Sequence, residues 1–73
     1  TITFEGMEMQ QIAKLMEREY GYHIVIKSSR LAQTRYYGAF NKKENSIDAI
    51  LKMLQQAKYF KYKIQDHTVT LSL

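Results

Sequence analysis

The sequence predicts a small α+β domain in which a β-α-β unit occurs twice and one strand follows, in the order β-α-β-β-α-β-β. In this fold class two helices pack with small β-sheets. Two observations predict it. Apolar residues recur at helical spacing in two segments and alternate with polar residues in the segments around them. When the first half of the chain is shifted by 38 positions, its apolar pattern coincides with that of the second half.

The bulk composition bounds the size and class of the domain. The chain has 73 residues, which is the size of one domain, and 45% of them are hydrophobic. It has no cysteine, which excludes a disulfide scaffold, a cysteine-ligated zinc site and thiol chemistry. No apolar run approaches the roughly 20 residues that a transmembrane helix needs. We therefore expect residues 1–73 to form a single domain, a module of a longer protein that is not itself embedded in a membrane.

The first copy of the unit begins with residues 1–4, which alternate as a half-buried strand does, and Gly6 is expected to end that strand. Residues 7–20 predict a helix, with Glu8 in its first turn. Its apolar stripe consists of Met9, Ile12, Ala13, Leu15, Met16 and Tyr20. Gly21 stands where a left-handed C-terminal cap is expected, and the β-branched run that follows predicts a strand over residues 22–28.

A connection over residues 29–35, with a short turn, leads to a third strand over residues 36–40. Gly38 inside that strand predicts a bulge or a close backbone approach. A polar loop follows, and Ser46 is the expected N-cap of the second helix, with Asp48 in its first turn.

The second helical stripe consists of Ile47, Ile50, Leu51, Met53, Leu54 and Ala57. Residues 60–64 then alternate as a strand, and "QDHT" fits a tight turn. The last strand is expected over residues 69–73, with Val69, Leu71 and Leu73 on one face.

The apolar positions of the two copies coincide at a shift of 38 in the helices and in the strands after them, whereas Phe4 and Phe40 stand 36 apart because the second loop is two residues longer. The matched pairs in the helices are Met9 with Ile47, Ile12 with Ile50, Ala13 with Leu51, Leu15 with Met53 and Met16 with Leu54, and those in the strands are Tyr22 with Phe60, Ile24 with Tyr62 and Ile26 with Ile64. Matched apolar positions predict a shared core. The lysines of the second loop have no counterpart in the first copy.

Four segments carry a resemblance to a known family: "ITFEGMEMQQIAKLMEREYGYHIVI", "YYGAF", "SIDAILKMLQQAKYFKYKI" and "TVTLSL". Together they resemble the C-terminal domain of FecR-like anti-sigma factors of the type abundant in Bacteroidetes. The matching positions are Ile2, Phe4, Tyr20, Gly21, Ile24, Ile26, Gly38, Phe40, Ser46, Ile50, Leu51, Leu54, Tyr62, Ile64 and Val69. Two local departures are "AKYF", where the family has a glycine, and "DHT", where it has Gly or Asn.

The resemblance implies a function. In such proteins a cytoplasmic N-terminal part holds a sigma factor, one transmembrane helix follows, and the periplasmic part reads the signalling domain of a TonB-dependent outer-membrane transporter. The plan is also similar to the STN signalling domain of secretins and TonB-dependent transducers, which implies two helices side by side between two small sheets. An STN domain is therefore an alternative identity.

Catalytic, cofactor and metal sites are not expected. His23 and His67 have no Cys, His or carboxylate at metal-ligand spacing. Glu17 and Glu19 lie two apart and do not share a helix face, and Glu17 is expected near Lys14 in an exposed ion-pair neighbourhood. The pair Lys42-Lys43 (residues 42–43) lacks the glycines that let backbone amides cradle a phosphate.

A partner-binding surface is the remaining candidate. Arg35, Tyr37, Lys61 and Lys63 should face outward if Phe40, Tyr62 and Ile64 face the core. Arg and Tyr are common at interface centres, and open sheet edges accept partner strands.

A further alternative is a small nucleic-acid-binding domain. The net charge is +4, and "RYY" and "YFKYK" interleave cations with aromatic rings. Only Tyr36 or Tyr37, together with Tyr59, are free of a core role in the repeat.

Overall fold

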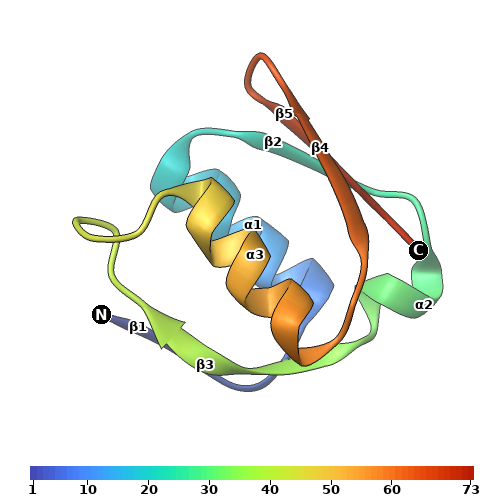
Figure 1. The fold of residues 1–73 in the computed structure, drawn as a ribbon, viewed down its shortest axis with the longest axis horizontal. Helices are drawn as coiled ribbons and strands as arrows, with labels where there is room; N and C mark the ends of the chain where they lie inside the picture. Colours follow the sequence, from blue (N-terminus) through green and yellow to red (C-terminus); the bar gives the residue numbers. More distant parts are fainter.

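The computed structural model describes residues 1–73 and contains two small sheets with two helices between them (Figure 1). Strands β1 (Ile2–Glu8) and β3 (Arg35–Phe40) form an antiparallel two-stranded sheet. The three-stranded sheet has the order β2-β5-β4, with β5 parallel to β2 and antiparallel to β4. Its strands are β2 (His23–Ile26), β4 (Lys61–Gln65) and β5 (Thr68–Ser72).

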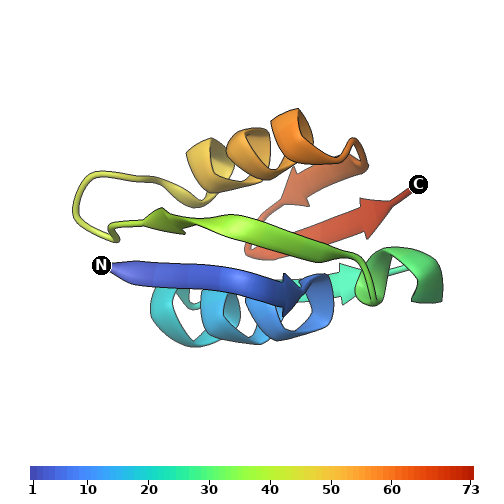
Figure 2. The ribbon, with the colours of Figure 1, turned by 90° about the horizontal axis from the view of Figure 1, so that it is seen from below.

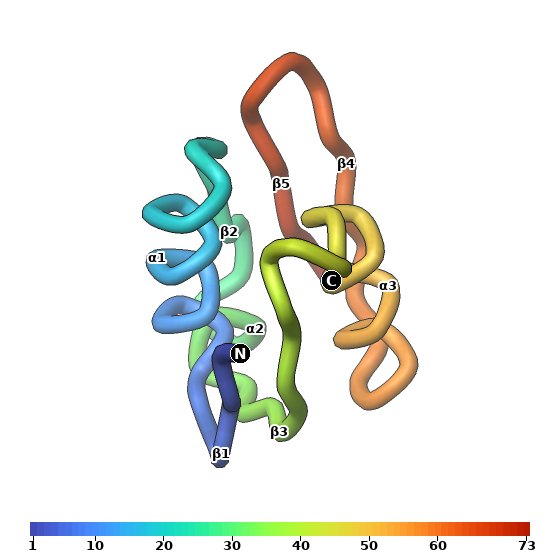
Figure 3. The backbone as a smooth tube through the Cα atoms, turned by 90° about the vertical axis from the view of Figure 1, so that its left-hand side faces the viewer, coloured from blue at the N-terminus to red at the C-terminus, as the bar shows by residue number.

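The helices α1 (Met9–Tyr20) and α3 (Ile47–Ala57) lie side by side between the sheets, and Figure 3 shows them on the two flanks of the molecule. A single helical turn, α2 (Ser29–Ala32), occupies the connection where only a turn was expected. None of the three helices combines the length and the hydrophobicity that crossing a bilayer requires. The predicted α+β class and the order of its main elements are thus confirmed.

One hydrophobic core fills the space enclosed by the helices and sheets. Its buried residues are Phe4, Met9, Ile12, Ala13, Met16, Ile24, Leu31, Tyr36, Phe40, Ile47, Ile50, Leu51, Leu54, Phe60, Val69 and Leu71. They come from all three helices and from β1, β2, β3 and β5, while Phe60 directly precedes β4. Burial of such side chains is worth about 1.5–3 kcal/mol each for the large aliphatic and aromatic ones, which makes this core the main source of stability.

The duplication is visible in three dimensions. The helices α1 and α3 begin at Met9 and Ile47, and β2 and β4 begin at His23 and Lys61, so each pair of elements is 38 residues apart. The first strands of the two copies pair with each other as β1 and β3 (Figure 2). The second strands share the other sheet, but β5 lies between them.

The strand β1 is longer than predicted because Gly6 bends it without ending it. The register between β1 and β3 shifts between Glu5 and Met7, and Gly6 has φ 70°, a left-handed value that favours glycine. The strand continues to Glu8, so α1 starts at Met9 and not at Met7. The N–H of Glu8 donates to the Gln11 side chain at 3.1 Å, which helps to fix the helix start.

Two of the predicted helix caps are present. Gly21 has φ 73° and donates its N–H to the carbonyl of Glu17 at 2.9 Å. At the start of α3, the Ser46 hydroxyl accepts the N–H of Ala49 at 3.2 Å. The helix α3 needs no glycine at its end because Lys58 leaves it in an extended conformation, with φ −143°.

Two local predictions change and one is confirmed. Gly38 pairs in regular register with Phe4, so the bulge of this sheet lies at Gly6 instead. The tight turn predicted between the last two strands is present, and its Asp66 has φ 56°, a conformation that aspartate tolerates better than most residues. Val69 and Leu71 are buried as expected, but Leu73 follows the end of β5 and is 54% exposed.

Candidate partner-binding surfaces

Arg35 and Tyr37 lie on the outer face of the two-stranded sheet, because the alternate side chains of β3 point into the core. The Arg35 Nη1 donates to the carbonyl of Gly6 at 2.6 Å, and its Nη2 lies 3.6 Å from the Glu8 carboxylate. A Cβ at Gly6 would lie 3.2 Å from the Tyr37 hydroxyl. Both side chains therefore fold across the bulge of β1, and the Arg35 guanidinium already has partners within the domain.

Lys61 and Lys63 lie on the outer face of the three-stranded sheet. Both are exposed, and they stand opposite Ser72 and Thr70 of β5. No carboxylate lies within ion-pair distance of either ammonium group. Their neighbours across the strand are neutral hydroxyl side chains, so the two charges are available to a partner.

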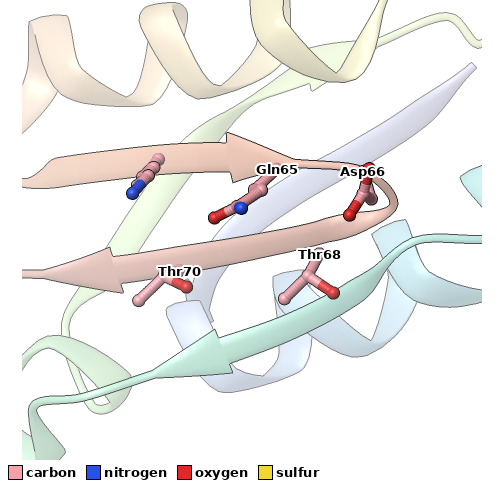
Figure 4. Close-up of a pocket in the computed structure, with 5 residues that line it drawn as sticks. Gln65, Asp66, Thr68 and Thr70 are labelled. Atoms are coloured by element: carbon pink, nitrogen blue, oxygen red, sulfur yellow. The ribbon is translucent and has the colours of Figure 1, made fainter.

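A shallow depression of about 270 Å³ lies on the same face, near the β4–β5 turn (Figure 4). Its lining residues are Lys63, Gln65, Asp66, Thr68 and Thr70, and none of them is hydrophobic. Figure 4 shows that Gln65 of β4 and Thr68 and Thr70 of β5 present their side chains to the same side. This surface suits polar and charged groups better than an apolar ligand.

The structure divides the four predicted residues between two surfaces. Arg35 and Tyr37 belong to one sheet and Lys61 and Lys63 to the other, and the two sheets cover opposite sides of the helices (Figure 1). All four are exposed, as the alternation of the strands predicted. A single docking face made from all four residues does not exist, and the two pairs are separate candidates.

The two histidines are brought together by the pairing of β2 with the start of β5. The N–H of His23 donates to the carbonyl of His67 at 2.7 Å, although the residues are 44 positions apart. The Nδ1 of His23 lies 3.5 Å from the Glu17 carboxylate. No group of three or more potential metal ligands forms here or elsewhere in the domain.

The Glu17 side chain has a different role from the predicted one. Its Oε2 accepts the main-chain N–H of Ile24 at 2.8 Å, and Lys14 is not its ion-pair partner. The contact joins α1 to the outer edge of β2. Spacing along a helix does not predict it, because the partner is a backbone group seven residues away on another element.

The loop that contains Lys42 and Lys43 satisfies its own backbone groups. The Asn41 side chain accepts the N–H of Lys43 at 2.9 Å, and the Asn41 carbonyl accepts the N–H groups of Glu44 and Asn45. Because these amides point inward, they do not form the open row that cradles a phosphate. The geometry favours a solvated loop over a phosphate site.

The tyrosines are mostly committed to the fold. Tyr36 is buried and donates its hydroxyl to the carbonyl of Lys58 at 3.2 Å, which leaves Tyr37 and Tyr59 as free rings, each 72% exposed. These two residues come from different parts of the chain and belong to no common strand or helix. Stacking on successive bases needs neighbouring platforms, so this arrangement gives little support to nucleic-acid binding.

A second contact that the sequence did not predict joins α3 to β4. The Tyr62 hydroxyl donates to the Asp48 carboxylate at 2.6 Å. Burial, and to a smaller extent this hydrogen bond, raises the pKa of Tyr62 to about 12. The hydrogen bond from Tyr62, with a smaller contribution from Lys52, lowers the pKa of Asp48.

Replacing Tyr62 by phenylalanine should lower stability by about 1 kcal/mol at pH 8, because it removes this hydrogen bond. Since the pKa of Tyr62 is raised in the folded state, its contribution is complete below the ordinary tyrosine pKa of about 10 and is lost as pH rises towards 12. Urea unfolding at pH 8 to 12 should therefore show the difference between the two proteins shrinking. A Tyr59→Phe variant is the control, and a difference that stays constant with pH would contradict the assignment.

Comparison with known families gives the chain its identity. Residues 1–71 match the family model described as FecR, C-terminal. The chain belongs to the FecR C-terminal family. The resemblance drawn from the sequence is thereby confirmed. No curated protein matches this FecR C-terminal domain.

Solved structures share the fold of this FecR C-terminal domain. Two crystal structures of a candidate anti-sigma factor from Parabacteroides distasonis ATCC 8503, at 1.65 and 2.50 Å resolution, superpose with TM-scores of 0.82 and 0.83. Sequence identity is 20% in both comparisons, over 96% and 97% of this chain. The match covers 32% of each solved chain, so the domain spans about a third of the length of these relatives.

Proposed function

We propose that this domain is the C-terminal module of an anti-sigma factor and that it acts by binding another protein, without catalysis. The observation that carries the proposal is the match to the FecR C-terminal family over residues 1–71. The fold similarity to a candidate anti-sigma factor supports it. The same match favours a sigma regulator over the STN domain of a transducer, which the sequence left as an alternative.

The finer part of the proposal concerns topology and partners. The domain is the periplasmic end of a single-pass inner-membrane protein whose cytoplasmic N-terminal part holds a sigma factor. Its direct partner is the signalling domain of a TonB-dependent outer-membrane transporter, a small domain of a similar STN-like plan. The exposed, unpaired cations on the three-stranded sheet support docking of this kind, because exposed charges steer association and set partner choice.

Titration calorimetry with the signalling domain of the transporter encoded beside this protein tests the proposal. We expect a dissociation constant in the micromolar range, which is typical of reversible signalling contacts. A double Lys61→Ala/Lys63→Ala variant should bind about tenfold more weakly, whereas Arg35→Ala/Tyr37→Ala should lose less, because Arg35 is engaged with Gly6 and Glu8. No detectable binding at 100 μM or so would contradict the proposed partner.

A further inference from the structure

The outer strand edges of the two sheets differ in how well they are blocked. On the two-stranded sheet, β1 carries the bulge at Gly6, and bulges twist an edge away from strand pairing. On β3, the Lys58 Nζ donates to the carbonyl of Arg35 at 2.9 Å, and α3 packs beside the strand (Figure 2). The edge of β1 is therefore interrupted at Gly6, and on the edge of β3 a side chain occupies the carbonyl of Arg35.

The edge of β2 is blocked by a side chain. The N–H groups of His23 and Lys27 donate to carbonyls of His67 and Leu71, so β2 uses alternate residues to pair with β5. Ile24 lies between them, and its backbone groups point to the opposite edge. The N–H of Ile24 is taken by the Glu17 carboxylate at 2.8 Å. A strand arriving at this edge would have to displace an ionised hydrogen-bond acceptor.

The edge of β4 is not blocked by a side chain in this way. Gln65 pairs with Thr68 across a two-residue turn, so these two residues exchange backbone hydrogen bonds. Further along the strand, Lys63 pairs with Thr70 and Lys61 with Ser72 in the same way. The alternation of an antiparallel ladder turns the N–H and C=O groups of Tyr62 and Ile64 away from β5. No side chain hydrogen-bonds to these groups.

The duplication shows why the two edges differ. At the 38-residue shift Glu17 corresponds to Gln55, and Ile24 corresponds to Tyr62. The Gln55 Nε2 donates to the carbonyl of Phe60 at 2.7 Å and leaves the N–H of Tyr62 without a partner. The contact that blocks the strand edge in the first copy is therefore replaced in the second copy by one that leaves the edge open.

The side chains of β4 give this open edge a chemical preference. Lys61 and Lys63 stand on the outer face, about 7 Å apart along the strand, which is the spacing of alternate residues in any extended segment. Tyr62 and Ile64, on the inner face, are only partly buried. A strand added at this edge would meet two ammonium groups on one face and an incompletely covered apolar surface on the other.

We propose that the free edge of β4 binds an extended acidic segment of a partner protein, which adds to the three-stranded sheet as a fourth strand. Its carboxylates lie opposite Lys61 and Lys63, and its alternate apolar side chains cover Tyr62 and Ile64. This inference rests on the proposed function only in taking the ligand to be a protein. It names the edge and the charge pattern that the partner must present.

A second copy of the chain fits the edge less well. Two β4 strands paired with each other would place lysines against lysines, and like charges directly opposite are unfavourable in a sheet. Lysine on an edge strand commonly discourages self-association. Carboxylates of an acidic segment would instead attract the two lysines. The same lysines therefore oppose dimerisation and select an acidic partner.

The test uses two capped ten-residue peptides, one alternating glutamate with valine and the other glutamine with valine. Binding is followed by fluorescence anisotropy, and amide hydrogen exchange is read residue by residue by NMR. We expect the glutamate peptide to slow exchange at Tyr62 and Ile64 at least about tenfold, and to bind at least about tenfold more tightly than the glutamine peptide. The double variant Lys61→Glu/Lys63→Glu should lose that preference, whereas Lys42→Glu/Lys43→Glu, with the same change of charge in an exposed loop, should keep it.

The proposal is overturned if neither peptide binds, if protection appears at Ile24 and Ile26 instead, or if both charge variants lose binding equally. Protection of Tyr62 and Ile64 that grows with protein concentration without peptide would identify a second copy as the occupant and would also overturn it. The transporter's signalling domain separates this inference from the proposed function. Binding of that domain without protection at Tyr62 and Ile64 removes the edge but keeps the function, whereas peptide binding alone keeps the edge and removes that partner.

Discussion

Replacing Phe60 by alanine is expected to lower the free energy of unfolding by about 3–5 kcal/mol, the usual cost of truncating a buried aromatic side chain. Phe60 has no exposed surface. Its ring packs edge-on against the ring of Tyr36, with 6.3 Å between the ring centroids, and its centroid also lies 6.3 Å from that of Tyr62. Tyr36 belongs to the two-stranded sheet and Tyr62 to the three-stranded sheet, so one side chain joins the two sheets at the end of α3.

The size of the domain makes this loss severe. A chain of 73 residues has a total stability of roughly 4–11 kcal/mol, so the Phe60→Ala variant should be largely unfolded or close to it at 37 °C. Urea unfolding followed by circular dichroism measures the change. Tyr59→Ala is the matched control, because Tyr59 is the neighbouring aromatic residue but is 72% exposed, and it should change stability by about 0.5 kcal/mol or less. A loss below about 1 kcal/mol in Phe60→Ala would contradict the packing described here.

The sequence predicts that Phe60 faces the core, but it does not predict which residues Phe60 contacts there. The shift of 38 places Phe60 and Tyr22 at equivalent positions, which already predicts an inward-facing ring. Local periodicity fixes which face of a helix or strand is apolar, because that pattern depends only on the 3.6- and 2-residue repeats of the backbone. The helices, their caps at Gly21 and Ser46 and most of the core could therefore be predicted.

Strand pairing could not be predicted in the same way. The pairing of β1 with β3 and the position of β5 between β2 and β4 depend on contacts between residues far apart in sequence. For this reason the exposure of Lys61 and Tyr37 was predictable from alternation, but their division between two sheets was not. At Gly6 the sequence predicts a strand end and the structure has a bulge, because a glycine with positive φ serves either purpose.

Side-chain contacts with backbone groups were the least predictable features of the candidate surfaces. Glu17 and Gln55 occupy equivalent positions in the two copies and have nearly the same shape, yet one binds an edge N–H and the other binds a carbonyl. A carboxylate can only accept from an N–H, whereas the amide of glutamine can also donate. This difference in chemistry becomes visible only when the strand edge that each side chain faces is known.

The second large effect is expected for Glu17→Ala. The variant leaves the N–H of Ile24 without its charged acceptor, and a hydrogen bond to a charged group is worth about 1.5–3 kcal/mol. The free energy of unfolding should fall by an amount near the lower end of that range, because the Glu17 side chain is 34% exposed and solvent screens its charge. Urea unfolding measures the loss, and Glu44→Ala, which removes an exposed carboxylate from the loop before α3, should leave stability almost unchanged.

Glu17→Ala also tests whether a single side chain makes the edges of the three-stranded sheet different. Without the carboxylate, the edge of β2 resembles the open edge of β4, and amide exchange at Ile24 should become at least about tenfold faster. The outer face of β2 carries His23 and Val25, with the single Lys27 just beyond the strand, whereas β4 carries two lysines. The freed edge of β2 should therefore also allow concentration-dependent self-association in analytical ultracentrifugation. If the Ile24 amide stays protected from exchange and the protein stays monomeric, Glu17 does not block the edge of β2. The difference between the edges of β2 and β4, on which the proposed binding of an acidic strand to β4 rests, would then have no physical basis.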